Sequence, residues 1–514
     1  MELDHDIWHE ITCLLANQSD KQTLLVLALV SRTLSGLALP ALWRDFFSLE
    51  EIVFTINSFA SEDDHFLVSF ESPEWDDEAP AGRWDLYRPI PEHARIRVSE
   101  YLSYVRTYVH DPNRDEEDRA KDEYLWSHLP IWLGLDGPLF PRLHHLYIQV
   151  FAGRRADVLL SLLCPSIGNL ILEFQEGPVE VKEISTIIDA IVNKGCDLHR
   201  LQFVGPICPP LLSDPSAFKN LRCLDIAVNN SEPVEPSSKV SIADLLTSLP
   251  SLYHFYCDTE AYIMPLPGSD IICHDSLTDL DIYGPASEIE KILLGFRFPL
   301  LLILQFVAHE GTFPQFERLY ETITSRSPMI RQFFSGLGSG LHEPTLEDLT
   351  PLFKLALESL DCQISKHLSA SDVETLVKSF PKLQKLHLST PSTYFHAAEI
   401  YSILSQHPRL EDLEIPVDLQ DLLSPSALDD TTVGAPNHVP SKSRIWKLSL
   451  DSASNIPSVM PEIGNLAKNL LRLFPNLSNV CTMCSIAFER EMERMIWALQ
   501  TDVVQQGPGL TPEY

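Results

Sequence analysis

A short apolar pattern recurs along most of the chain. Its clearest copy lies at residues 380–389, where Pro381 is followed by Leu383, Leu386 and Leu388 in the order Pro-x-Leu-x-x-Leu-x-Leu. Apolar residues at alternate positions predict a short strand that buries every second side chain. The first apolar position of each copy comes 23 to 35 residues after that of the previous copy. These positions are Leu143, Ile167, Leu198, Leu221, Leu252, Leu277, Leu301, Ile330, Leu357, Leu383, Leu410, Ile445 and Leu477.

Most segments between these copies have the apolar spacing of one helical face, as at Ile184, Ile187, Ile188 and Ile191. In several copies a proline then ends the helix, because it disfavours helical backbone at the residue before it. A single copy would indicate an ordinary buried strand. Thirteen copies in order predict an α/β leucine-rich-repeat solenoid, because each unit is too small to bury its own apolar face and must stack on its neighbours.

The first 47 residues have a different pattern, which predicts a group of short helices. Ile7, Trp8 and Ile11 share one helical face, and a dense apolar segment follows at residues 24–30. A group of this size buries too little apolar surface to be stable alone. Two interpretations are open: the helices cap the end of the solenoid, or they dock on a partner. We favour docking, because the apolar residues lie ahead of a long stretch without repeats.

The arrangement of these residues resembles an F-box, of the F-box-like type found in fungi. The resemblance rests on Leu3, the segment Ile7-Trp8-x-x-Ile11, the apolar residues 24–29, Val30-Ser31-Arg32 and Leu39-Pro40-x-Leu42-Trp43-Arg44; Asp4 stands where the family has a proline. It implies docking on the Skp adaptor of an SCF-type cullin-RING ubiquitin ligase, while a repeat array recruits the substrate. The residues expected to bind the adaptor are Leu3, Ile7, Trp8, Ile11, Leu27 and Leu29.

The predicted organisation has four parts. Residues 1–47 form an all-helical F-box-like domain, and 48–100 form an irregular spacer with an acidic loop. Residues 101–500 form the solenoid, which opens with an atypical strand at 101–106, and 501–514 form a disordered tail. The Ser-, Pro- and Asn-rich residues 229–239 and the long segment 416–443 are expected to be loops.

Composition narrows the function classes. The chain has 72 acidic and 38 basic residues and a net charge of −34. It shows no basic stripe, so we expect neither a nucleic-acid nor a membrane partner. The cysteines lie in apolar contexts typical of small core residues. The N-terminus lacks the features of a signal peptide, and the longest apolar runs are too short to span a bilayer. We therefore expect a soluble cytoplasmic or nuclear protein.

Catalytic motifs are missing, so we expect no enzyme activity and no cofactor. The sequence contains no Gly-x-x-x-x-Gly-Lys, His-Glu-x-x-His or Gly-x-Ser-x-Gly. Cys481 and Cys484 have metal-ligand spacing, but no second pair follows and structural zinc takes four ligands. We therefore expect no metal.

The predicted strands should turn the residues between their leucines outward, toward the concave inner face of the solenoid. Acidic residues are frequent there, so we expect a target with a basic segment and aromatic anchors on this face. The candidate substrate-binding residues are Tyr147, Asp225, Tyr256, Asp279, Asp281, Phe334, Asp361, Asp412 and Glu414. An ordinary solvated surface would have the same appearance.

Three function classes remain open. We favour a substrate-recruiting F-box subunit. The alternative is a non-catalytic leucine-rich-repeat scaffold without a ubiquitin-ligase role. A small-molecule receptor like the F-box hormone receptors of plants would need a basic pocket for an anionic ligand, and the expected face is acidic. The sequence does not identify the target, say whether its recognition needs phosphorylation, or set the solenoid's curvature.

Overall fold

The structure is a computed structural model. It describes residues 5–18, 20–60, 66–70, 83–110, 116–150, 156–174, 181–205, 218–228, 240–264, 271–310, 316–338, 343–364, 368–389, 395, 407, 409–415, 447–450, 466–471, 477, 479–482 and 492–500. The predicted tail and the predicted loops at 229–239 and 416–443 lie outside these residues. The chain divides into two compact units, Met1–Ile263 and Met264–Tyr514.

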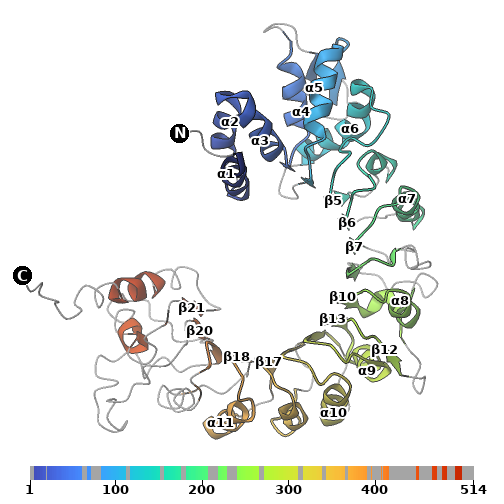
Figure 1. Cartoon of the computed structure of the whole chain (residues 1–514). Coiled ribbons are helices and arrows are strands. Elements are labelled where there is room, and N and C mark those ends of the chain that lie inside the picture. The colour runs from blue at the N-terminus through green and yellow to red at the C-terminus, as the bar shows by residue number, and fades with distance from the viewer. Residues whose placement is uncertain are drawn as a thin grey trace, which may run out of the picture. The chain divides into compact units, whose positions relative to one another are not determined.

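The first unit begins with helices and continues into a parallel sheet (Figure 1). Its helices are α1 (His5–Asn17), α2 (Lys21–Val30), α3 (Arg32–Leu42), α4 (Glu50–Asn57), α5 (Glu92–Leu102), α6 (Glu116–Leu133), η1 (Ala156–Ser161), α7 (Val181–Asn193), α8 (Ile242–Ser248) and η5 (Thr259–Ala261). Its strands are β1 (Asp45–Phe46), β2 (Leu67–Phe70), β3 (Arg83–Leu86), β4 (Thr107–Val109), β5 (His145–Val150), β6 (Asn169–Phe174), β7 (Arg200–Gly205), β8 (Cys223–Val228), β9 (Val240–Ser241), β10 (His254–Asp258) and β11 (Tyr262–Ile263).

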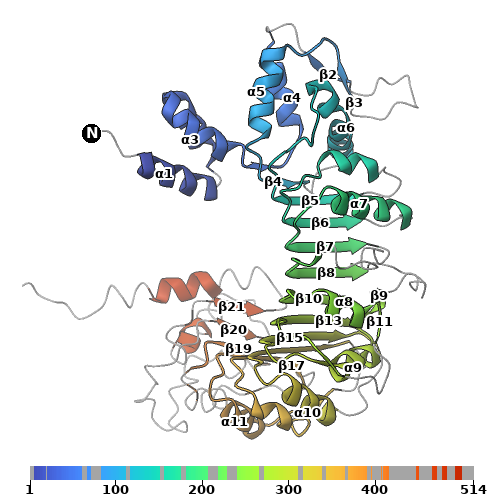
Figure 2. The ribbon, with the colours of Figure 1, turned by 45° about the vertical axis from the view of Figure 1, so that its right-hand side comes forward.

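In this unit the parallel sheet has the order β1-β4-β5-β6-β7-β8-β10. Figure 2 shows β5 to β8 stacked in chain order, with α7 beside them. Strands that pair in chain order need a crossover between them, and η1 and α7 lie in two of these crossovers. Strands β2 and β3 form a separate antiparallel pair.

The second unit continues the alternation of strand and helix. Its strands are β12 (Ile272–Cys273), β13 (Asp279–Gly284), β14 (Phe296–Arg297), β15 (Ile303–Ala308), β16 (Gln332–Leu337), β17 (Ser359–Gln363), β18 (Lys385–Ser389), β19 (Asp412–Ile415), β20 (Lys447–Leu450) and β21 (Asn479–Thr482). Its labelled helices are α9 (Ala286–Gly295), α10 (Phe316–Arg326), η6 (Thr350–Lys354) and α11 (Ala370–Ser379), and residues 466–471 and 492–500 are helical as well. The parallel sheet has the order β13-β15-β16-β17-β18-β19-β20-β21, and α9, α10 and α11 lie on one side of it (Figures 1 and 2).

The recurring apolar positions form the core. The first apolar residue of every predicted copy is 2% exposed or less, apart from Ile445, which lies outside the described residues. The second position is also buried in the copies from Leu146 to Leu413, and in the second unit Leu304, Phe333, Leu360, Leu386 and Leu413 pair in register from strand to strand. The prediction of an α/β fold with short parallel strands is therefore confirmed.

Side-chain caps explain where two of the helices begin. Ser31 follows the last residue of α2, and its hydroxyl accepts a hydrogen bond from the backbone N–H of Leu34 at 3.2 Å, so one residue separates α2 from α3. Ser369 and Asp372 form a reciprocal capping box at the start of α11. Both caps are local in sequence.

The prediction of an irregular spacer at residues 48–100 is wrong for much of that range, which contains α4, β2, β3 and most of α5. Ile52, Val53 and Ile56 form a buried face of α4. The start of α4 is capped from far along the chain, because the buried carboxylate of Asp122 in α6 accepts a hydrogen bond from the Leu49 N–H at 3.0 Å. This partner cannot be recognised from the sequence of the range itself.

The first strands of the sheet also differ from the prediction. Residues 101–106 form no strand, because Ala94, Val98 and Leu102 have helical spacing and are buried in α5, which ends at Leu102. The sheet instead begins with β1, which pairs with β4 and lies inside the predicted helical domain 1–47. Trp43 follows α3 and stacks on Phe46 and Tyr101 with ring centroids 5.6 and 5.0 Å apart, which ties the first helices to the sheet.

The described residues also bear on the expectations for membrane spans and cysteines. None of their helices combines the length and apolar character that crossing a membrane requires. The described cysteines are free thiols; Cys164, Cys257 and Cys362 are buried as expected for small core residues, whereas Cys13 and Cys273 are exposed.

Candidate functional site

One row of outward-facing side chains crosses the sheet of the second unit. Strand pairing places Asp281, Gln305, Phe334, Asp361, His387 and Glu414 next to one another, from β13 to β19. We call the sheet face that carries this row the polar face of the second unit. Its residues are the outward positions predicted from the repeat, because side chains alternate along each strand.

His387 is the centre of an acidic cluster on this face. Its Nδ1 lies 3.3 Å from Oδ2 of Asp361 and 3.8 Å from Oε2 of Glu414, and its Nε2 lies 3.3 Å from Oδ1 of Asp412. The cluster therefore joins three neighbouring strands, β17, β18 and β19. Both ring nitrogens face carboxylates, so the imidazole acts here as a cation rather than as a metal ligand.

The surroundings of His387 shift its pKa upward. Burial of the ring favours the neutral form, but the carboxylates of Asp361, Asp412 and Glu414 outweigh burial and raise the pKa of His387 to about 9. The ring is therefore protonated at neutral pH. The cluster thus sets three carboxylates around one imidazolium.

A second ionic group lies on the outward face of the first unit. Asp225 of β8 is 8% exposed, and its two carboxylate oxygens lie 2.9 Å from Nη2 of Arg200 and 2.8 Å from Nε2 of His254. Tyr147 of β5 donates a hydrogen bond to Oε2 of Glu173 at 2.6 Å. These two candidate residues are thus bound to neighbouring strands, which limits what they can offer to a partner.

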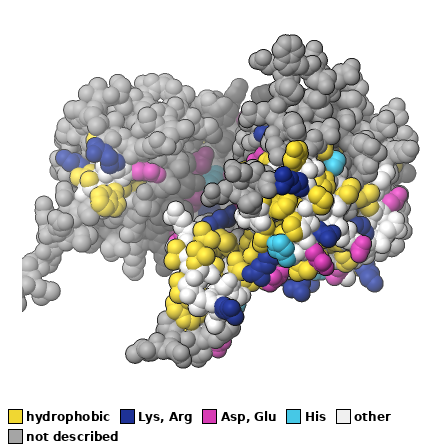
Figure 3. All heavy atoms as spheres, turned by 90° about the horizontal axis from the view of Figure 1, so that it is seen from above, with side chains coloured by type: hydrophobic (Ala, Val, Ile, Leu, Met, Phe, Trp, Pro, Cys, Tyr) yellow, Lys and Arg dark blue, Asp and Glu magenta, His cyan; other side chains and the backbone are white. Residues whose placement is uncertain are grey.

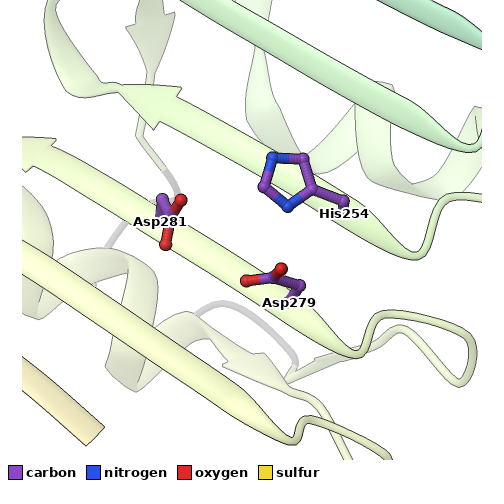
Figure 4. A group of neighbouring side chains, drawn as sticks. All are labelled: His254, Asp279 and Asp281. Atoms are coloured by element: carbon purple, nitrogen blue, oxygen red, sulfur yellow. The ribbon is translucent and has the colours of Figure 1, made fainter. Parts of the chain in front are cut away.

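The remaining candidates occupy outward positions of their strands. Asp279 and Asp281 project from the same side of β13 (Figure 4). Tyr256 of β10 and Phe334 of β16 are half-buried, so each exposes part of an aromatic ring. Asp412 is 4% exposed, so it contributes charge to the cluster more than contact area.

The first three helices expose apolar side chains. Leu29 is 79% exposed and Ile7 is 44% exposed, and Leu14, Leu25, Val26 and Val30 are exposed as well. Trp8, Ile11 and Leu27 are half-buried, and Leu3 lies outside the described residues. Figure 3 shows the molecule from above, with hydrophobic side chains interspersed with Lys, Arg, Asp and Glu on the surface that faces the viewer. An exposed apolar group of this kind is typical of a surface that binds another protein.

The structure brings the predicted residues together in separate groups, one of which pairs Asp225 of β8 with Tyr256 of β10. Phe334, Asp361, Asp412 and Glu414 lie together on β16 to β19. The sequence-based candidates do not include His387 and Arg200, which the structure places against the carboxylates of neighbouring strands. The signal was present in the repeat, because residues at equivalent positions of adjacent copies become neighbours in a parallel sheet.

The sequence matches no protein-family model, and no curated protein is significantly similar to it.

Proposed function

We propose that this protein is a non-catalytic, substrate-recruiting F-box subunit of an SCF-type cullin-RING ubiquitin ligase in the cytoplasm or nucleus. In this proposal the helices α1 to α3 are the F-box-like domain and dock on the Skp adaptor. The parallel sheet with its helices is a leucine-rich-repeat solenoid, and its outward face binds a target protein. The proposal needs no cofactor, metal or nucleic acid.

The observation that carries the proposal is the apolar surface of α1 to α3. A helix of a globular protein normally turns its apolar stripe inward, yet α2 buries only Leu24 while Leu25, Val26, Leu29 and Val30 are exposed. Apolar side chains exposed in this density favour a partner that covers them. Burying a Leu or Ile side chain is worth about 1.5 to 3 kcal/mol before ordering costs.

The acidic cluster around His387 supports the second half of the proposal. It lies beside Phe334 on the polar face of the second unit, so an aromatic contact and negative charge are available together. A basic target segment fits this combination, because opposite charge steers encounter and an aromatic anchor supplies contact area.

The test of adaptor docking uses exposed residues, so that the fold is preserved. We expect Ile7→Asp/Leu29→Asp to weaken binding of the Skp adaptor by on the order of a hundredfold or more, because two buried apolar contacts are lost. The matched control is Ile96→Asp/Ile131→Asp, which places the same charges at residues 64% and 73% exposed in α5 and α6. Binding is measured by calorimetry, and folding is checked by circular dichroism.

The outcomes distinguish the two candidate functions. Loss of binding in the first variant alone supports the F-box role. If the folded wild-type protein does not bind the adaptor, the ligase role is refuted and the protein is better described as a repeat scaffold. Equal loss in both variants would also contradict docking through α1 to α3.

A further inference from the structure

A row of basic side chains lies at the edge of the sheet of the first unit where the strands begin. Arg44, Arg106, His144, His199 and Arg222 each directly precede a strand, namely β1, β4, β5, β7 and β8. We call these five residues the basic row. Arg44, His144, His199 and Arg222 are exposed, and Arg106 is half-buried.

Backbone hydrogen bonds hold the row in register. The N–H of Arg106 donates to the carbonyl of Arg44 at 2.8 Å, and the N–H of His144 donates to the carbonyl of Arg106 at 2.8 Å. The same hydrogen bonds continue along the edge at 2.7 to 3.0 Å. The N–H of Gly168 donates to the carbonyl of His144, that of His199 to Gly168, and that of Arg222 to His199. Because neighbouring strands are roughly 4.8 Å apart, the row from β1 to β8 extends over about 24 Å.

The basic groups are close enough to influence one another. The Nη1 group of Arg106 donates to the carbonyl of Arg142 at 3.4 Å, which places exposed Arg142 next to the row. Burial, followed by the positive charges of Arg142 and Arg44, lowers the pKa of Arg106. Among the described residues no carboxylate lies in ion-pair contact with Arg44, Arg142 or Arg222, and Asp197 near the row accepts a hydrogen bond from Asn220.

The corresponding edge of the second unit has fewer basic side chains. The equivalent positions there are Thr278, Leu302, Arg331, Glu358, Gln384 and Glu411, which are joined by the same hydrogen-bond pattern. The one cation among them, Arg331, pairs with Glu358 at 3.3 Å. The concentration of positive charge is thus a property of the first unit and not of the repeat itself.

We propose that the basic row is a docking site for an acidic, extended peptide segment of a partner protein. An extended chain rises about 3.3 Å per residue, so seven or eight residues match the length of the row. The next position in the same hydrogen-bond pattern is Tyr253, which is 44% exposed, whereas the stacking of successive bases uses a series of aromatic rings and the row itself consists of Arg and His. The net charge of −34 also repels a long polyanion more than a short acidic peptide.

The proposal does not depend on adaptor binding, because the row residues stand just before the strands and are distinct from the exposed apolar residues of α1 to α3. The probe is a fluorescein-labelled peptide of five Glu-Ser repeats, compared with five Gln-Ser repeats and with a deoxythymidine oligonucleotide of ten nucleotides. Binding to the full-length protein is followed by fluorescence anisotropy at low ionic strength, where exposed charge interactions are least screened.

The test variant is Arg44→Gln/Arg142→Gln/Arg222→Gln. Its matched control is Arg318→Gln/Lys382→Gln/Arg409→Gln, which removes three exposed charges from the second unit. Three exposed ion pairs at about 0.5 kcal/mol each predict on the order of tenfold weaker binding of the Glu-Ser peptide to the first variant, with little change for the control. Equal weakening in both variants, equal binding of the Gln-Ser peptide, or preference for the oligonucleotide would each overturn the proposal.

Discussion

At the scale of single residues, His387 shows how a repeat protein can assemble a charged group from separate strands. One imidazolium holds three carboxylates that would otherwise repel one another across β17, β18 and β19. The folded pKa of about 9 lies above the ordinary value of 6.5. Protonation of His387 therefore stabilises the folded protein. This contribution to the free energy of unfolding is complete below the pKa of the unfolded state and disappears as the pH rises through the pKa of the folded state.

The stability of the protein should therefore depend on His387 in a defined pH window. The rise of the pKa from 6.5 to about 9 implies a stabilising contribution that is complete below pH 6.5, as long as the surrounding carboxylates are ionised, and that is lost as the pH rises toward 9. We expect His387→Gln to lower the melting temperature most below pH 6.5, and the difference from wild type to shrink between pH 6.5 and pH 9. The exposed His9→Gln in α1 is the control. A difference that stays constant from pH 6 to pH 10 would contradict this account.

At the scale of elements, helix α11 supports the strands that carry the cluster. Val373, Leu376 and Val377 form its buried face, and the capping box of Ser369 and Asp372 fixes its start. In a parallel sheet the strands are joined through such crossovers, so the position of each strand depends on the helix before it. A well-formed start of α11 thus helps to set the position of β18.

Removing the cap should loosen α11 locally. We expect Ser369→Ala to cost about 1 kcal/mol and to increase hydrogen exchange within residues 370–379. Ser371→Ala in the same helix is the matched control, since no side-chain hydrogen bond of Ser371 is seen in the described structure and alanine favours helix. Identical exchange in the two variants would mean that the cap does not hold the helix.

At the scale of the whole molecule, charge is distributed unevenly. The chain carries a net charge of −34, yet basic side chains concentrate on one strand edge of the first unit and carboxylates concentrate around His387 in the second. A net charge of this size destabilises the compact state through repulsion between like charges, and dissolved salt screens that repulsion.

The melting temperature should therefore rise with moderate sodium chloride at neutral pH. We expect an increase on the order of 1–3 °C on reaching physiological ionic strength from very low salt, measured by differential scanning calorimetry. A fall in melting temperature over the same range would show that attractive ion pairs, such as those of His387, outweigh the general repulsion.

The sequence by itself determined the strands of the repeat and the core that they bury, but not the strands that precede the repeat. Apolar spacing is a local property, so Leu143, Leu383 and the equivalent residues of the other copies identified buried positions, and alternation placed Asp361 and His387 outward. The helices at 48–100 were missed in part because their stabilising partner, Asp122, is remote in sequence.

Only the tertiary structure decided which outward residues are neighbours. Arg44, Arg106 and His144 lie tens of residues apart and form no basic run in the sequence, but strand pairing places them side by side. The same pairing surrounds His387 with carboxylates from the strands on both sides and places Arg200 and His254 against Asp225. The physical reason is that burial follows from local periodicity, whereas charge interactions depend on the distances that the paired strands create.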